Sequence, residues 1–80
     1  MLDESDHLVT VNGKRYLTVE LAMQRWSRKR STIEAWIRED RIARQYVLGK
    51  WWVLEADMQA AFRKRVQSER LKRLIRRHAR

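Results

Sequence analysis

The chain has 80 residues, a formal net charge of +9 at pH 7, and no cysteine or proline. The lack of cysteine excludes disulfides, a thiol nucleophile and a thiolate metal site, and no apolar run reaches the ~18 residues of a membrane-spanning helix. A chain of this length supports one domain with a small core. Its first residues, MLDESDH, are acidic and polar, the reverse of a signal peptide, which predicts a cytoplasmic location.

The charge is distributed unevenly along the chain. Residues 1–62 hold 10 basic and 9 acidic side chains, whereas residues 63–80 hold 9 basic side chains and a single acidic one, Glu69. The first part is therefore almost neutral and the C-terminal part is a polycation. Such an imbalance indicates a partner that is nucleic acid, an anionic membrane surface or an acidic protein.

The N-terminal part predicts a disordered segment followed by a hairpin. Residues 1–7 show no hydrophobic periodicity, so we expect them to be disordered. Residues 8–11 and 14–17 favour strands, and Asn12-Gly13 between them tolerates the positive φ angles of a type I′ turn. The segment 8–17 is thus a short hairpin or, as the alternative, an extended arm.

A first short helix follows this segment. Thr18 is suited to be its N-cap, and Glu20 in the first turn favours the helix dipole. We expect Leu21, Ala22 and Trp26 to face inward. Residues 27–30, with the sequence SRKR, form a basic turn that leads to a second helix.

The second helix is predicted from about residue 32 to about residue 40. Ser31 and Glu34 have the spacing of a capping box, in which each side chain accepts from a backbone N–H group of the other residue. One face repeats at i, i+3, i+4 and is expected to be buried; it consists of Ile33, Trp36 and Ile37. The opposite face is small or cationic and consists of Thr32, Ala35 and Arg38. Such a helix presents its outer face to an anionic partner.

Residues 45–54 predict a second hairpin. Aromatic and β-branched residues on both sides of Gly49-Lys50 favour strands, and we expect Gly49-Lys50 to form the turn. Side chains alternate along a strand, so one of the adjacent Trp51 and Trp52 faces the core and the other faces the surface. As the alternative, both tryptophans pack around the small core.

A third helix is predicted from Glu55 onward, with two apolar stripes. The first comprises Met58, Ala61, Phe62 and Val66, and the second comprises Leu71, Leu74, Ile75 and His78. The step of five residues between the stripes rotates the second by roughly 140° from the first. Either the chain bends near residues 67–68, or the second stripe points away from the domain as part of a basic amphipathic tail.

The order of these elements is a helix-turn-helix followed by a two-stranded wing and a further helix. Four segments resemble motifs of excisionase-type DNA-binding domains, and the resemblance covers about residues 16–62, most of the ordered chain. Tyr16–Ala22 resembles the opening "YLTVEEAA", and Ser31–Arg38 resembles the recognition helix "STVYRWIR". Gly49–Val53 is similar to the wing "GGRWRI", and Asp57–Phe62 resembles the closing "DLEAFL".

This sequence departs from the family pattern at both ends of the second helix. Ser27 and Arg28 stand where the family has a glycine and an aliphatic residue in the turn, and Asp40 stands where it has a glycine after the helix. Aspartate tolerates a left-handed backbone better than most residues do.

The resemblance implies a recombination directionality factor with a MerR-like winged-helix domain. The expected fold is mainly α with a small β part: residues 1–7 disordered, residues 8–66 the winged helix with an additional N-terminal hairpin, and residues 67–80 the tail. The implied function is that of a phage or integrative-element excisionase, which binds and bends attachment-site DNA and directs a tyrosine integrase toward excision. Neighbouring protomers bind the DNA cooperatively in the bacterial cytoplasm, without a cofactor.

The candidate binding residues fall into three groups. In the turn and recognition helix they are Arg28, Lys29, Arg30, Ser31, Thr32, Ala35 and Arg38. In the wing they are Lys50 and Trp51. In the tail, for phosphates or a protein partner, they are Arg63, Lys64, Arg65, Arg70, Lys72, Arg73, Arg76 and Arg77. Two alternatives are that Ser31 only caps the helix and that Arg38 only pairs with Glu34 at i, i+4.

Two other functions fit parts of the same pattern. A small transcriptional regulator of this fold shares every DNA-contact residue, and an interaction module acts through the cationic tail on a protein or membrane. Catalysis is not expected, because no acid–base pair or nucleophile with its base is present in the sequence. The only histidines, His7 and His78, lie at opposite ends of the chain, so we expect no metal site.

Overall fold

The computed structural model describes residues 3–78, with side chains through residue 75. It is a small mixed α/β protein in which helices predominate over a four-stranded antiparallel sheet. The elements in chain order are α1 (Glu4–His7), β1 (Leu8–Val11), β2 (Lys14–Thr18), α2 (Val19–Trp26), α3 (Arg30–Glu39), β3 (Arg44–Val47), β4 (Lys50–Leu54) and α4 (Glu55–His78). The prediction of a mainly helical chain with a small β part is confirmed.

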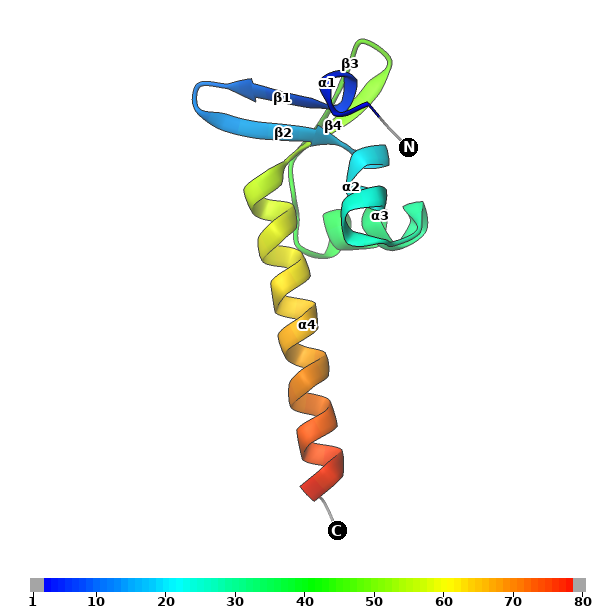
Figure 1. Cartoon of the computed structure of the whole chain (residues 1–80), viewed down its shortest axis with the longest axis vertical. Helices are drawn as coiled ribbons and strands as arrows, with labels where there is room; N and C mark the ends of the chain where they lie inside the picture. Colours follow the sequence, from blue (N-terminus) through cyan, green and yellow to red (C-terminus); the bar gives the residue numbers. More distant parts are fainter. Residues whose placement is uncertain (1–2, 79–80) are drawn as a thin grey trace.

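The two predicted hairpins are joined into one sheet. Its strand order is β1-β2-β4-β3, and every neighbouring pair is antiparallel. The link is the pairing of β2 with β4, in which Leu17 lies opposite Val53. Figure 1 shows the sheet at one end of the molecule, with α2, α3 and the start of α4 on one side of it.

The first turn has the predicted geometry, whereas the second is displaced by one residue. Asn12 and Gly13 have φ angles of 53° and 76°, both positive as in a type I′ turn. In the second hairpin the two central residues are Leu48 and Gly49, with φ angles of 51° and 78°. The predicted Gly49-Lys50 turn is therefore wrong: Gly49 takes the second turn position, and Lys50 begins β4.

The N-terminal segment is more ordered than expected. Residues 1–7 were predicted to be disordered, but Glu4–His7 form α1, and the carboxylate of Asp3 caps it by accepting from the backbone N–H of Ser5 at 3.0 Å. His7 Nδ1 and Thr18 Oγ1 share a 2.7 Å hydrogen bond, which ties α1 to the start of α2. Met1 and Leu2 lie outside the described residues.

The core lies between the helices and one face of the sheet. Thr18 is the N-cap of α2 as predicted, with its Oγ1 accepting from the backbone N–H of Leu21 at 3.2 Å. The apolar residues expected to face inward from the first two helices are all buried. Among residues 3–75 the buried apolar residues are Leu17, Val19, Leu21, Ala22, Trp26, Ile33, Trp36, Ile37, Ile42, Val53, Met58 and Ala61.

The ends of α3 differ from the prediction. Its backbone hydrogen bonds begin with Ile33 N–H to Lys29 O at 3.0 Å, which makes Lys29 the N-cap and leaves Ser31 inside the first turn. The predicted capping box is therefore wrong, because Lys29 makes no side-chain cap and Glu34 instead pairs with Arg30. At the other end Asp40 has a φ of −93°, and the left-handed conformation is adopted by the next residue, Arg41, with φ 53°.

Helix α4 runs without interruption from Glu55 to His78 and extends far beyond the sheet (Figure 1). Of its first stripe, Met58 and Ala61 are buried and Phe62 and Val66 are half-buried. The described part of its second stripe is exposed: Leu71, Leu74 and Ile75 retain 59%, 52% and 58% of their accessible surface. Of the two predicted alternatives, the helix therefore does not bend near residues 67–68, and its second stripe points away from the domain. No helix in residues 3–78 combines the length and apolar character needed to cross a membrane.

Candidate nucleic-acid interface

The outer face of α3 is held in place by the core. Ile33, Trp36 and Ile37 are 0%, 7% and 4% exposed, which fixes the rotation of the helix about its axis. On the opposite side Ser31 and Arg38 are exposed and Ala35 is half-buried. The guanidinium of Arg38 has no hydrogen-bond or ion-pair partner among the described residues, so the alternative in which Arg38 only pairs with Glu34 is wrong, and Glu34 pairs with Arg30 instead. Arg38 is therefore available to an external anion.

Thr32 lies at the edge of this face rather than at its centre. It is half-buried and lines a shallow groove between α3 and α4, together with Trp36, Phe62 and Lys72. The groove has a volume of about 330 Å³. Of the three residues predicted for the outer face, Arg38 is thus the most accessible and Thr32 is turned toward the last helix.

The three basic residues before and at the start of α3 differ in their partners. Arg30 pairs with Glu20 at 3.2 Å and with Glu34 at 3.7 Å. All three side chains are about 40% exposed, and ion pairs of this kind contribute only about 0–1 kcal/mol, so Arg30 can exchange its partners for a phosphate. Lys29 is exposed, and within the described chain its ammonium group has no partner.

Arg28 has a structural role in the free protein. It donates to the carbonyl oxygens of Trp26 and Ser27, each at 3.1 Å, at the end of α2. Its guanidinium also lies 5.9 Å from the ring centre of Trp36 and 5.8 Å from that of Phe62. Ser27, which stands where the resembling family has a glycine, takes the left-handed C-cap conformation with φ 51°. Arg28 thus stabilises a turn that contains no glycine.

Two arginines that the sequence reasoning missed, Arg41 and Arg44, continue the basic face toward the β3–β4 hairpin. Arg38, Arg41 and Arg44 line one hollow at the end of α3, together with Glu34. None of these three arginines forms an ion pair within the part of the chain that the structure describes. Their regular spacing of three residues was the available signal, but it crosses from a helix into a strand and therefore matches neither periodicity.

The aromatic residues of the β3–β4 hairpin lie on opposite faces of the sheet. Trp51 is 37% exposed, packs edge-to-face on Tyr46 with ring centres 5.0 Å apart, and carries the guanidinium of Arg44 at 4.6 Å. Trp52 is half-buried on the other face, and its Nε1 donates to the Val47 carbonyl oxygen at 3.2 Å. Trp51 is thus the more exposed of the two, and neither tryptophan belongs to the buried core.

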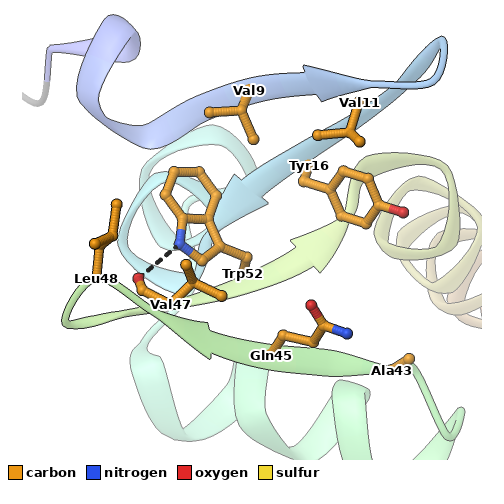
Figure 2. A pocket seen from close by; sticks show the side chains of 8 residues that line it. All are labelled: Val9, Val11, Tyr16, Ala43, Gln45, Val47, Leu48 and Trp52. Carbon is orange, nitrogen blue, oxygen red and sulfur yellow. Dashed lines mark hydrogen bonds between the residues drawn. The ribbon is translucent and has the colours of Figure 1, made fainter.

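Trp52 belongs to a groove on the open face of the sheet, the face not covered by α2, α3 and α4. The groove has a volume of about 410 Å³, and Figure 2 shows its side chains. The lining residues are Val9, Val11, Tyr16, Ala43, Gln45, Val47, Leu48 and Trp52. Sequence reasoning missed this surface, because it arises only when β2 pairs with β4.

Lys50 is less available than predicted. It stands at the start of β4 rather than at the tip, it is half-buried, and its Nζ donates to the carbonyl oxygen of Asp6 at 2.7 Å. The tip of the hairpin is formed by Leu48 and Gly49. An external contact by Lys50 therefore requires its bond to α1 to open.

The basic residues of α4 divide into an engaged pair and a free set. Arg65 binds Glu39 at 2.9 Å and Asp40 at 3.1 Å, Lys64 binds Asp40 at 3.2 Å, and the Arg65 guanidinium lies 5.1 Å from the Trp36 ring centre. The hydrogen bond from Arg65 lowers the pKa of Asp40 and raises that of Arg65 itself.

The free set is exposed and unpaired within residues 3–75; it consists of Arg63, Arg70, Lys72 and Arg73. The side chains of Arg76 and Arg77 lie outside the described residues.

This arrangement suits recognition of an anion. Guanidinium groups at Arg38, Arg41 and Arg44 can donate in pairs to phosphate or to a base edge. In the described part of the chain, no group of three potential ligand residues lies close enough to hold a metal ion. Comparisons with protein-family models, with curated proteins and with solved structures found no match.

Proposed function

We propose that the chain is a double-stranded DNA-binding protein in which α2, α3 and the β3–β4 hairpin act as a winged helix-turn-helix. Helix α3 enters a major groove with Ser31, Ala35 and Arg38 toward the bases. The observation that carries the proposal is the strip of unpaired arginines, Arg38, Arg41 and Arg44, which continues from the outer face of α3 toward the hairpin. Helices in this position read base edges with a few side chains and contact phosphates with the rest.

The wing and the tail add contacts on either side of the helix. Arg44, stacked on Trp51, reaches the backbone of an adjacent minor groove, where arginine is the preferred cation. The free cations of α4, from Arg63 to Arg73, contact flanking phosphates or a protein partner. Because Lys64 and Arg65 bind Glu39 and Asp40, their role is to hold α4 against α3.

Within this DNA-binding function, the resemblance of four segments favours the role of an excisionase. In that role several protomers bind neighbouring sites in attachment-site DNA, bend it, and present their tails to a tyrosine integrase. The exposed stripe Leu71, Leu74 and Ile75 is the surface on which such a partner packs. A transcriptional regulator remains the second candidate, because it uses the same contacts with DNA.

DNA binding is tested by selecting duplexes from a random-sequence pool and measuring their affinity by gel shift. We expect one preferred sequence, and a plot of log K against log salt with a slope of about −0.9 per neutralised phosphate.

The variant Arg38→Ala should weaken binding to the selected sequence by about 1–3 kcal/mol. The control Arg15→Gln removes one positive charge near the β1–β2 turn, where Arg15 pairs with Glu55, and should leave affinity nearly unchanged. Equal binding of all duplexes would contradict the proposal.

The excisionase role needs a separate test. A recombination assay with a tyrosine integrase and its attachment sites measures the ratio of excised to integrated product. An excisionase shifts this ratio toward excision, whereas a regulator leaves it unchanged and alters transcription from a promoter that contains the selected sequence. If the chain is instead an interaction module, the Arg38→Ala variant would still bind its protein or membrane partner but would not bind the duplex.

A further inference from the structure

The two hairpins of the sheet turn in the same way but with different residues. The two central φ angles are 53° and 76° at Asn12-Gly13, and 51° and 78° at Leu48-Gly49. Asparagine and glycine adopt this left-handed backbone readily, whereas the side chain of leucine is crowded by it. Leu48 therefore occupies a position for which the local backbone favours another type of residue.

Packing within the protein does not explain Leu48 either. Its side chain is 93% exposed, the highest value among the large apolar residues that the structure describes. Hydrophobic burial thus contributes almost nothing to a leucine at this position in the free protein. The unfavourable backbone conformation, which no burial of the side chain offsets, leads to the hypothesis of a contact that is made only with a partner.

The hairpin that carries Leu48 is braced on both faces. On one face Trp52 Nε1 donates to the carbonyl oxygen of Val47, the residue before the turn. On the other face the rings of Tyr46 and Trp51 pack edge-to-face across the two strands. The β3–β4 turn projects from the sheet in Figure 1, and Figure 2 shows Leu48 at its outer end. The hairpin therefore holds an apolar side chain at the end of a stiff support.

We propose that Leu48 is an intercalating wedge, which the β3–β4 hairpin inserts from the minor groove between two base pairs. Apolar wedges of this kind partly unstack a base step and kink the duplex by about 20–90° toward the major groove. The inference rests on the proposed DNA binding and explains how one protomer bends its site. Pyrimidine–purine steps, which unstack most easily, are the expected points of insertion.

A protein partner in the groove on the open face is the competing use of Leu48. Leu48 and Val11 lie at opposite ends of that groove (Figure 2), so a segment bound along it would contact both. A wedge uses Leu48 alone. Substitutions at these two positions therefore separate the two roles.

The test uses the full chain and the tightest duplex from the selection, with fluorophores at its ends and 2-aminopurine next to the site. Wild-type protein should increase energy transfer between the ends and the fluorescence of the unstacked 2-aminopurine. Leu48→Asn places at this turn the residue found in the other hairpin, so its thermal midpoint should be unchanged or higher. We expect Leu48→Asn to lose both fluorescence changes, while its affinity falls by about tenfold or less.

Two further variants serve as controls. Leu48→Met retains an apolar wedge and should keep both fluorescence changes, and Val11→Thr should behave as the wild type does. The wedge proposal is wrong if Leu48→Asn still bends and unstacks the duplex, or if the wild type binds the duplex without bending it. It is also wrong if Val11→Thr loses the same signals. In each of these cases the proposed DNA binding is unaffected. If the wild type selects no duplex, the proposed function is wrong and the wedge with it.

Discussion

The two halves of α4 have the same backbone structure and opposite surroundings. Residues 55–66 pack against the sheet and α3, with Met58 and Ala61 buried. From residue 67 to residue 75, every side chain is exposed, including the apolar residues Leu71, Leu74 and Ile75. The comparison teaches that backbone hydrogen bonds extend a helix well beyond the region where packing stabilises it, once an anchored segment has removed the cost of nucleation.

Arg65 lies at the boundary between these halves. It joins α4 to Glu39 and Asp40 at the end of α3, and it covers one face of the Trp36 ring. Beyond it, the apolar stripe is rotated by roughly 140°, so a straight helix cannot turn that stripe toward the body. The contacts of Arg65 therefore separate a packed half from a half that is available to partners.

The largest expected effect comes from truncating a buried side chain in the first half. Met58 is fully buried, so Met58→Ala should lower the free energy of unfolding by about 2–5 kcal/mol. The matched change in the second half, Leu74→Ala, should alter it by less than about 0.5 kcal/mol. Urea denaturation followed by tryptophan fluorescence measures both. Similar losses for the two variants would show that the second half packs on the body.

Breaking the boundary contact should have an intermediate effect. Arg65→Met removes the partner of two carboxylates, and we expect a loss of about 1–2 kcal/mol, between the values for exposed and buried ion pairs. Arg63→Met, which removes an exposed and unpaired cation of the same helix, is the control and should have no effect on unfolding. If both variants unfold as the wild type does, Arg65 does not hold α4 to α3.

The same contact predicts a dependence of stability on pH. The bond from Arg65 lowers the pKa of Asp40 in the folded protein, relative to about 3.9 in the unfolded chain. The resulting stabilisation is therefore present above about pH 4 and is lost as the pH falls through the folded pKa. Urea midpoints between about pH 5 and pH 2 should decline, and the decline should be shallower in Arg65→Met. The pKa of Asp3 is also lowered by its bonds to Ser5, which leaves part of the decline in the variant.

The smallest effect on stability is expected from removing residues 67–80. The side chains described from 67 to 75 are exposed, so the urea midpoint should change little, while far-UV circular dichroism loses the signal of the removed helix. The slope of DNA binding against salt should become shallower by about 0.9 for each lost phosphate contact. An unchanged slope would mean that the tail does not touch DNA.

Local features were predicted well because they depend on neighbouring residues. The cap at Thr18, the turn at Asn12-Gly13 and the inward stripe of α3 each follow from sequence spacing. The errors have tertiary or backbone causes. The capping box failed because the backbone of α3 begins at Arg30, and the second hairpin turn begins one residue earlier, at Leu48.

Within the candidate site, the exposed Arg38 was predictable but its surroundings were not. Which arginines are free depends on pairings between distant elements, such as Arg30 with Glu20 and Arg65 with Asp40. The contribution of Arg41 and Arg44 also appeared only when the end of α3 and the start of β3 were brought around one hollow.

The sequence by itself determined the order of the elements from β1 onward, their apolar faces and the basic character of the last helix, because short-range propensities and periodicity encode these features. Only the tertiary structure decided that both hairpins share a sheet, that Leu48 stands exposed at a turn, and that the second stripe of α4 remains uncovered. These outcomes depend on strand pairing and on the rotation of one helix against another. Such contacts join residues too far apart in the chain for any local pattern to specify.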